Sequence, residues 1–183
     1  MPSAADVTRA VSEMRASHPT SANWGSTHEG WGAASLTYNR DEGRIIELVM
    51  TISGVAPDTL ASAGPGGVLG PIHIHNYPQG GPDFFVQQMP GEIEATEDGF
   101  IYRVSNWTME PAMVGPDHVD VDFVLSEIAA GNAYFGLHTT DAFCPGNKKE
   151  GVAGTCAAPG TALSGHITVL PAPDPNVLAL VTR

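Results

Sequence analysis

Glycine and proline are spread along the whole chain, with 21 glycines and 15 prolines among 183 residues. Glycine permits the backbone conformations that tight turns need, and proline cannot continue a regular hydrogen-bonded element. Segments between these residues are therefore short, which favours many strands joined by turns over long helices. We expect a mainly β fold, built as a small antiparallel β-sandwich or barrel.

The length of the chain fits one ordinary domain, and a hydrophobic content of 42% is sufficient for a core. No internal repeat or shift in composition marks a boundary. We predict a single domain over residues 1–183, with an N-terminal helix and linker at 1–20, a β core at 30–170 and a tail at 171–183.

A short helix is predicted near the N-terminus. Four apolar residues recur there at i, i+3, i+4 and i+7, namely Val7, Ala10, Val11 and Met14. This spacing places them on one face of a helix of three or four turns. We expect the helix to pack on the sheet or on a neighbouring subunit, so a homo-oligomer is compatible with the sequence.

Strand-like segments separated by turn residues follow. The first two, 33–39 and 44–55, flank the turn at 39–43 and predict a hairpin. A helical turn at 126–130 is expected to end at Gly131. Further strands are predicted at 70–76, 84–88, 100–106, 118–125, 133–139 and 163–170.

The charge of the chain bears on its partners. Twenty acidic residues against eight basic ones give a formal net charge of −12, which repels phosphate backbones and anionic membranes. No stretch approaches the roughly 20 apolar residues of a spanning helix. We therefore expect neither a nucleic-acid partner nor membrane insertion.

Cys144 and Cys156 are the two cysteines, and they flank a loop rich in Gly, Lys and Pro. We predict a disulfide between them, which implies an extracellular or periplasmic protein whose signal peptide is absent from these residues. Two free buried thiols are an alternative. Thiolate metal ligands are the other alternative, although neither CxxC nor a Cys/His zinc spacing is present.

The pair His73 and His75 is the strongest candidate for chemistry. Alternate side chains of a strand share a face, so the two imidazoles lie opposite Ile72 and Ile74 and can converge on one ion. His138 takes the same position relative to its apolar neighbours. We predict a metal site formed by these three histidines.

Other polar residues fall on the same side of their predicted strands. His166 lies opposite its apolar neighbours and is a candidate fourth ligand, while His118, Asp120 and Asp122 alternate with apolar residues in their own segment. A face turned toward water explains the same alternation.

A further set of polar residues is predicted to orient the ligands or assist chemistry. These are Tyr134, Asn76, Asp83, His118, Asp120 and Asp122.

Two motifs resemble the chordin-type CHRD domain family. Gly70-Pro71-Ile72-His73-Ile74-His75-Asn76 is similar to the family's Ala-His-Ile-His-Gly strand, and 134–140 to its later Tyr-Val-Asn-Val-His-Thr strand. The resemblance covers roughly residues 32–170. It implies a small, usually exported β-sandwich or barrel, and no established reaction.

The last strand departs from that family. Leu163-Ser164-Gly165-His166-Ile167-Thr168 stands where Gly-Glu-Ile-Arg-Gly-Gln is usual, and the insert at 140–163 is long. The exchange removes a Glu and an Arg and makes a four-histidine site conceivable. Similarity to the copper/zinc superoxide dismutase sandwich is weaker, because its zinc-ligand loop is not recognisable.

Three functions are compatible with these residues. The first is a small metalloenzyme, in which copper, favoured over zinc, performs oxidoreductase chemistry on a small-molecule substrate. The second is a non-catalytic metal carrier or sensor, and the third is a CHRD-like interaction module whose histidines are structural. The sequence shows no hydrolase elbow, P-loop or dinucleotide fingerprint.

Overall fold

The computed structural model describes residues 7–17, 28–62, 70–76, 85–114, 117–140 and 161–172. These residues form one α-helix, α2 (Val121–Ala130), and a short 3₁₀ turn, η2 (Pro57–Thr59). The strands are β1 (Val7–Arg15), β2 (Trp31–Asn39), β3 (Arg44–Ser53), β4 (Ile72–Asn76), β5 (Val86–Gln88), β6 (Glu92–Thr96), β7 (Gly99–Thr108), β8 (Ala112–Val114), β9 (Asp117–Val119), β10 (Ala133–His138), β11 (Thr161–His166) and β12 (Thr168–Val169).

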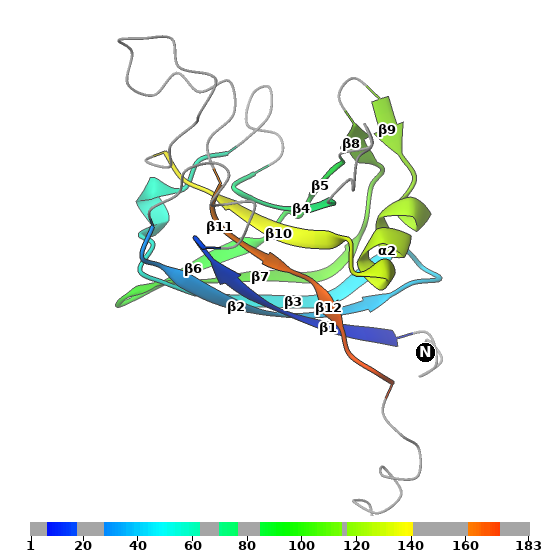
Figure 1. The fold of residues 1–183 in the computed structure, drawn as a ribbon, viewed down its shortest axis with the longest axis horizontal. Coiled ribbons are helices and arrows are strands. Elements are labelled where there is room, and N and C mark those ends of the chain that lie inside the picture. The colour runs from blue at the N-terminus through cyan, green and yellow to red at the C-terminus, as the bar shows by residue number, and fades with distance from the viewer. Residues whose placement is uncertain are drawn as a thin grey trace, which may run out of the picture.

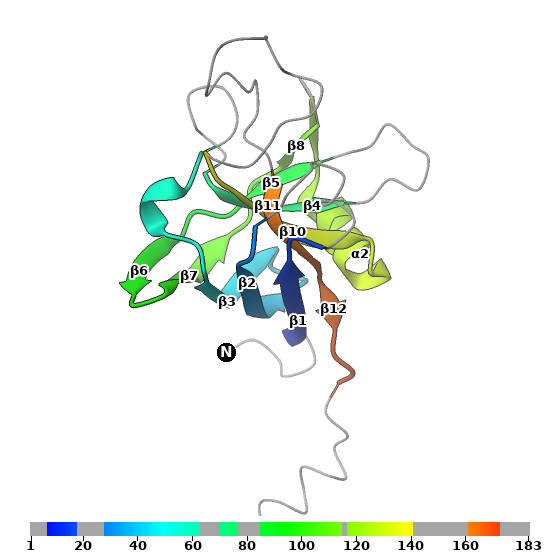
Figure 2. The ribbon, with the colours of Figure 1, turned by 60° about the vertical axis from the view of Figure 1, so that its left-hand side comes forward.

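The strands form one antiparallel sheet in the order β6-β7-β3-β2-β1-β11-β10-β4-β5-β8-β9, and β12 pairs with β1. The sheet curls into a half-barrel, so that β2, β3 and β7 lie below β4 and β10 (Figure 1). The view turned by 60° shows the same curl, with α2 beside the end of β10 (Figure 2). The prediction of a mainly β, antiparallel fold is confirmed.

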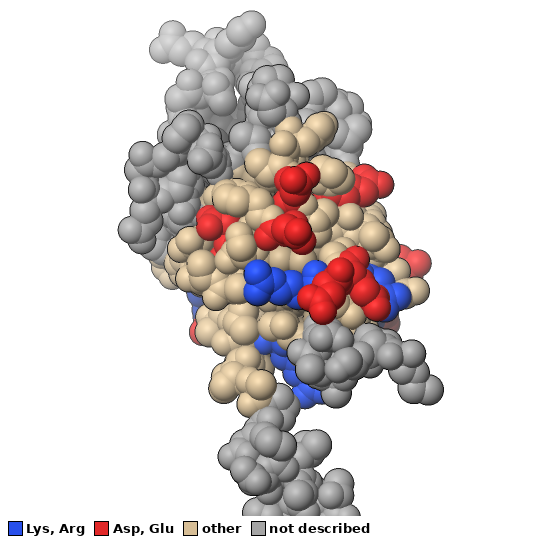
Figure 3. All heavy atoms as spheres, turned by 90° about the vertical axis from the view of Figure 1, so that its right-hand side faces the viewer, with Lys and Arg blue, Asp and Glu red and all other residues tan. Residues whose placement is uncertain are grey.

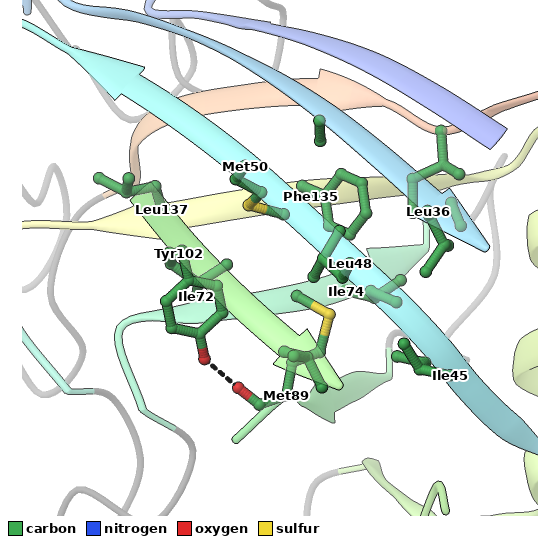
Figure 4. Packing of buried hydrophobic residues seen from close by; sticks show 14 of the residues in the cluster. Leu36, Ile45, Leu48, Met50, Ile72, Ile74, Met89, Tyr102, Phe135 and Leu137 are labelled. Atoms are coloured by element: carbon green, nitrogen blue, oxygen red, sulfur yellow. Dashed lines mark hydrogen bonds between the residues drawn. The ribbon is translucent and has the colours of Figure 1, made fainter. Parts of the chain in front are cut away.

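The core lies inside this curl. Apolar side chains from β2 and β3 meet those of β4 and β10 there (Figure 4). Burying each large apolar side chain contributes roughly 1.5–3 kcal/mol. The core faces of β4 and β10 consist of Ile72, Ile74, Phe135 and Leu137, each 0% exposed. The intervening residues of both strands must therefore point to the opposite side of the sheet.

The predicted N-terminal helix is wrong, because Val7–Arg15 is strand β1. Burial along β1 has a period of two: Ala10, Ser12 and Met14 are buried, whereas Val11 is 39% exposed. The four apolar residues at helical spacing lie on both faces of the strand. Ser12 is polar although it is buried, so the sequence did not show the alternation of apolar and polar residues that identifies a strand. Pairing with β2 over the full length of β1 stabilises the extended form.

The predicted strand at 118–125 is also wrong. Strand β9 ends at Val119, and α2 begins at Val121 and buries Val124, Leu125 and Ile128 on one helical face. The helix ends at Gly131 as predicted, since that residue adopts a left-handed φ of 76°. The alternating apolar and acidic residues at 119–123 therefore form the end of β9 and the first turn of α2.

The predicted hairpin is confirmed, since β2 and β3 pair from Asn39↔Arg44 to Trp31↔Ser53. The last predicted strand is divided into β11 and β12, because Ile167 turns its amide toward the carbonyl of Ala133. Strands β6 and β8 had not been predicted. All five residues of β6 are exposed, so this edge strand lacks the apolar alternation that identifies a strand.

Surface charges of both signs occur on the face that carries α2. Acidic side chains form separate groups beside a band of Arg side chains (Figure 3). Arg44 forms an ion pair with Glu42, and Arg103 lies 3.9 Å from Glu94. The net negative charge of the chain is therefore not gathered into one patch on this face.

Among the described residues, no helix is long and apolar enough to cross a membrane.

Candidate metal centre

His73, His75 and His138 come together on the side of the sheet away from the core. Strands β4 and β10 are antiparallel neighbours, and their register places His73 opposite Gly136 and His75 opposite Tyr134. His138 follows Gly136 by two residues and so shares its face. The prediction that these three side chains gather is confirmed, and we call them the histidine cluster.

The ring nitrogens of the cluster are close enough to share one ion. One ligand atom from each histidine lies within 4.8 Å of the other two. Nδ1 of His73 lies 3.3 Å from Nε2 of His75. All three residues are buried, with exposures of 1%, 5% and 6% for His73, His75 and His138.

The carbonyl of Gly70 fixes the orientation of His73. It accepts a hydrogen bond of 2.6 Å from Nε2 of His73. Because a carbonyl can only accept, Nε2 carries the proton and Nδ1 of the neutral ring presents its lone pair to His75. Gly70 adopts a φ of 70°, which L side chains rarely adopt, so this turn depends on glycine. A backbone carbonyl behind an imidazole is the usual support of a metal-binding histidine.

Backbone hydrogen bonds hold His138 beside an irregularity in the sheet. The register with β11 shifts by one residue between Leu137 and His138, which is a β-bulge. The amide of His138 donates to the carbonyl of Pro71, just before β4, and its carbonyl accepts from the amide of Ala61. The extra residue of the bulge is Ala162 of β11, and the two backbone hydrogen bonds hold His138 at the end of β10.

Burial keeps His73 and His75 neutral. Burial lowers the pKa of His73 to about 3, the proximity of His138 adds to the shift, and the hydrogen bond to Gly70 opposes it. The pKa of His75 falls well below 6.5 for the same principal reason, with further contributions from His73 and His138, opposed by a hydrogen bond with the backbone of Phe85. Neutral imidazole is the form that binds metal ions.

Tyr134 and Asn76 occupy different positions around the cluster. The ring of Tyr134 stacks on His75, with centroids 5.3 Å apart and planes inclined by 24°. The side chain of Asn76 instead accepts from the amide of Phe85 and donates to Glu127 on α2. Asn76 therefore ties the end of β4, next to His75, to the helix.

His166 lies on the same face as the cluster but outside it. Its partner on the neighbouring strand β10 is Tyr134. Tyr134 also lies opposite His75 of β4, so this tyrosine stands between the two histidines. His166 is exposed and borders a hollow of about 430 Å³ between the end of α2 and β12. Within the described residues it does not belong to the group whose ligand atoms converge.

The remaining candidates lie elsewhere. His118 is exposed on β9, and Asp120 and Asp122 are exposed at the beginning of α2. Their predicted common face depended on a strand that the structure replaces with a helix. The candidate Asp83 and the predicted disulfide between Cys144 and Cys156 lie outside the described residues.

Gly70, Gly136 and Glu127 had not been predicted to support the site. Gly136 lies on the ligand face of β10, and a glycine at that position of an otherwise bulky strand is a signal. Glu127 gave no signal in the sequence, since a carboxylate in the middle of a helix is ordinary. The role of Gly70 depends on a turn conformation that the residue type permits but does not specify.

Comparison with protein-family models, with curated proteins and with solved structures found no match to this chain. The geometry of the histidine cluster therefore carries the functional argument.

Proposed function

We propose that the histidine cluster binds one metal ion and that the chain is a small copper-dependent oxidoreductase. One observation carries this proposal: three buried imidazoles converge to within 4.8 Å, and the carbonyl of Gly70 turns the lone pair of His73 toward the group. Three histidines buried together are costly unless they serve a common partner, and a metal ion is the partner that accepts three lone pairs.

The spacing of the donors fits an ion. Two nitrogens bound at about 2.0–2.1 Å in a tetrahedral site are roughly 3.3 Å apart. The recorded separation between His73 Nδ1 and His75 Nε2 is 3.3 Å.

The donor set favours copper, with zinc as the alternative. The converging group contains neither a carboxylate nor a thiolate among the described residues. Imidazole alone suits copper, zinc, iron and nickel, and copper stands highest in affinity among the divalent ions of this series. When bound, copper would supply one-electron chemistry, whereas zinc would act as a Lewis acid.

Three protein ligands leave a coordination position for water or a small-molecule substrate, which supports an enzyme over a carrier with a filled site. A metal carrier or sensor, and an interaction module with structural histidines, are the competing outcomes. Membership of the chordin-type family and export remain predictions from the sequence.

Elemental analysis of untagged protein tests the proposal. We expect about one copper or zinc per chain after reconstitution, and loss of that metal in a His73→Ala, His75→Ala double variant. His118→Ala is the matched control, because it removes an exposed histidine of β9. Circular dichroism verifies that each variant is folded. Absence of stoichiometric metal in the reconstituted parent protein would overturn the proposal and favour an interaction module.

Catalysis is tested separately. The copper-loaded protein should consume dioxygen or superoxide in the presence of a small organic reductant, and the double variant should not. A protein that holds one copper, shows no turnover and releases the metal readily to a chelator would be a carrier.

A further inference from the structure

Gly136 occupies the centre of the histidine cluster. It lies directly opposite His73 across the β4–β10 pair, and on its own strand it stands between Tyr134 and His138. Alternation along β10 gives these residues a common face. The backbone of Gly136 is therefore the part of the sheet over which the three imidazoles meet.

A side chain at this position would press on the imidazoles. A Cβ atom built on Gly136 would lie 3.0 Å from Cδ2 and 3.2 Å from Nε2 of His75, and 3.5 Å from Nε2 of His138. The first two distances are shorter than ordinary van der Waals contacts, so the ring of His75 would have to shift. The atoms that it meets include Nε2 of both histidines, and Nε2 of His75 is the nitrogen that faces His73.

Other strand glycines serve the fold in a way that Gly136 does not. A Cβ on Gly99 would lie 2.1 Å from the carbonyl oxygen of Ile52, and one on Gly165 would lie 2.1 Å from that of Glu13. Those two glycines permit close approach of neighbouring backbones. At Gly136 the three nearest atoms are all imidazole atoms, and its φ is not positive. Neither the chain conformation nor strand packing demands glycine there.

We propose that Gly136 is a positioning residue for the metal, because its missing side chain leaves the space in which His75 and His138 turn their Nε2 atoms to one ion. This inference rests on the proposed metal-binding function. Glycine at this position allows all three histidines to bind the same ion. An alanine would leave the three histidines in the chain and prevent them from binding that ion together.

The test compares Gly136→Ala with Gly32→Ala in the full chain. Gly32 is a matched control because it is also a strand glycine without a positive φ, and its Cβ would meet the terminal Cδ1 of Ile52 at 2.5 Å, far from any histidine of the cluster. Copper(II) is the probe. Chelator competition gives the affinity, and electron paramagnetic resonance gives the number of coordinating imidazoles from nitrogen hyperfine structure.

We expect Gly136→Ala to bind copper(II) about 10- to 100-fold more weakly, the range typical for residues that orient metal ligands. Its hyperfine pattern should show fewer imidazoles than the parent, while Gly32→Ala retains both the affinity and the pattern. Equal affinity and an equal pattern in Gly136→Ala would overturn the inference and leave the proposed metal site intact. A parent protein that binds no copper would instead overturn the proposed function.

A variant that lost its fold would show altered circular dichroism without metal. In that event Gly136→Ala and the parent would be compared at low temperature, where the variant is refolded, by the same two readouts. Affinity equal to that of the parent, corrected for the folded fraction, would again contradict the role of Gly136.

Discussion

The carbonyl oxygen of Gly70 lies 2.6 Å from Nε2 of His73 and accepts a hydrogen bond from it. This relationship decides which nitrogen of His73 is available. A histidine that donates through Nε2 binds through Nδ1, and Nδ1 is the atom that faces His75. The turn before β4 is therefore part of the metal site, although it contributes no side chain.

The first prediction concerns that turn. Replacing Gly70 with alanine places an L side chain at a φ of 70°, which costs about 1 kcal/mol or more and displaces the carbonyl behind His73. We expect copper(II) affinity to fall about tenfold. Gly131→Ala is the control, because Gly131 has a φ of 76° and, like Gly70, open space around its Cβ position. Equal copper affinity in both variants would contradict a role for the carbonyl.

Metal should stabilise the chain, because only the folded state brings His138 to the other two ligands. With redox-inert zinc(II) at 100 times its dissociation constant, the free energy of unfolding should rise by about 2.7 kcal/mol. His138→Ala should abolish this gain, and a chelator should reverse it in the parent. The measurement is urea unfolding with and without zinc(II). An increase that persisted in His138→Ala would indicate binding elsewhere.

The link between β4 and α2 should matter for both stability and the site. Asn76→Ala removes the acceptor for the buried amide of Phe85 and the donor to Glu127, which we expect to cost roughly 1–3 kcal/mol. The copper(II) resonance spectrum should also change, because the side chain of Asn76 holds the end of β4 next to His75. Asn132→Ala removes another amide from Glu127 and serves as the control. An unchanged spectrum in Asn76→Ala would limit Asn76 to a structural role.

Alkaline pH should destabilise the core at Tyr102. Burial raises the pKa of Tyr102 to about 12, although a hydrogen bond with the backbone of Gly91 lowers it. In the unfolded chain the phenol ionises near 10, so the contribution of Tyr102 is complete below that pH and is lost as pH rises toward 12. The loss amounts to roughly 2 kcal/mol.

Unfolding of Tyr102→Phe and of the parent between pH 8 and pH 12, measured in urea, checks this prediction. The difference in the free energy of unfolding between the two proteins separates the effect of Tyr102 from that of Tyr38, because burial also raises the pKa of Tyr38. We expect that difference to change progressively above about pH 10. Parallel curves over the whole range would show that the ionisation of Tyr102 is not coupled to unfolding.

Local patterns predicted several parts of this molecule correctly. Glycine and proline indicated short antiparallel strands, and the turn at 39–43 indicated the β2–β3 hairpin. The patterns failed where one spacing suits two structures. The apolar residues of β1 fit a helix as well as a strand, and the residues before Val124 fit a strand as well as the beginning of α2. Pairing with β2 decided the first case, and burial of one helical face decided the second.

The sequence by itself determined that His73 and His75 share a face and that His138 lies on the corresponding face of its own strand, because side chains alternate strictly along an extended chain. Only the tertiary structure decided that β4 and β10, some 60 residues apart, are neighbours, and that Tyr134 separates His166 from His75. Strand order and register come from the packing of the whole sheet around one core, and no local pattern encodes them.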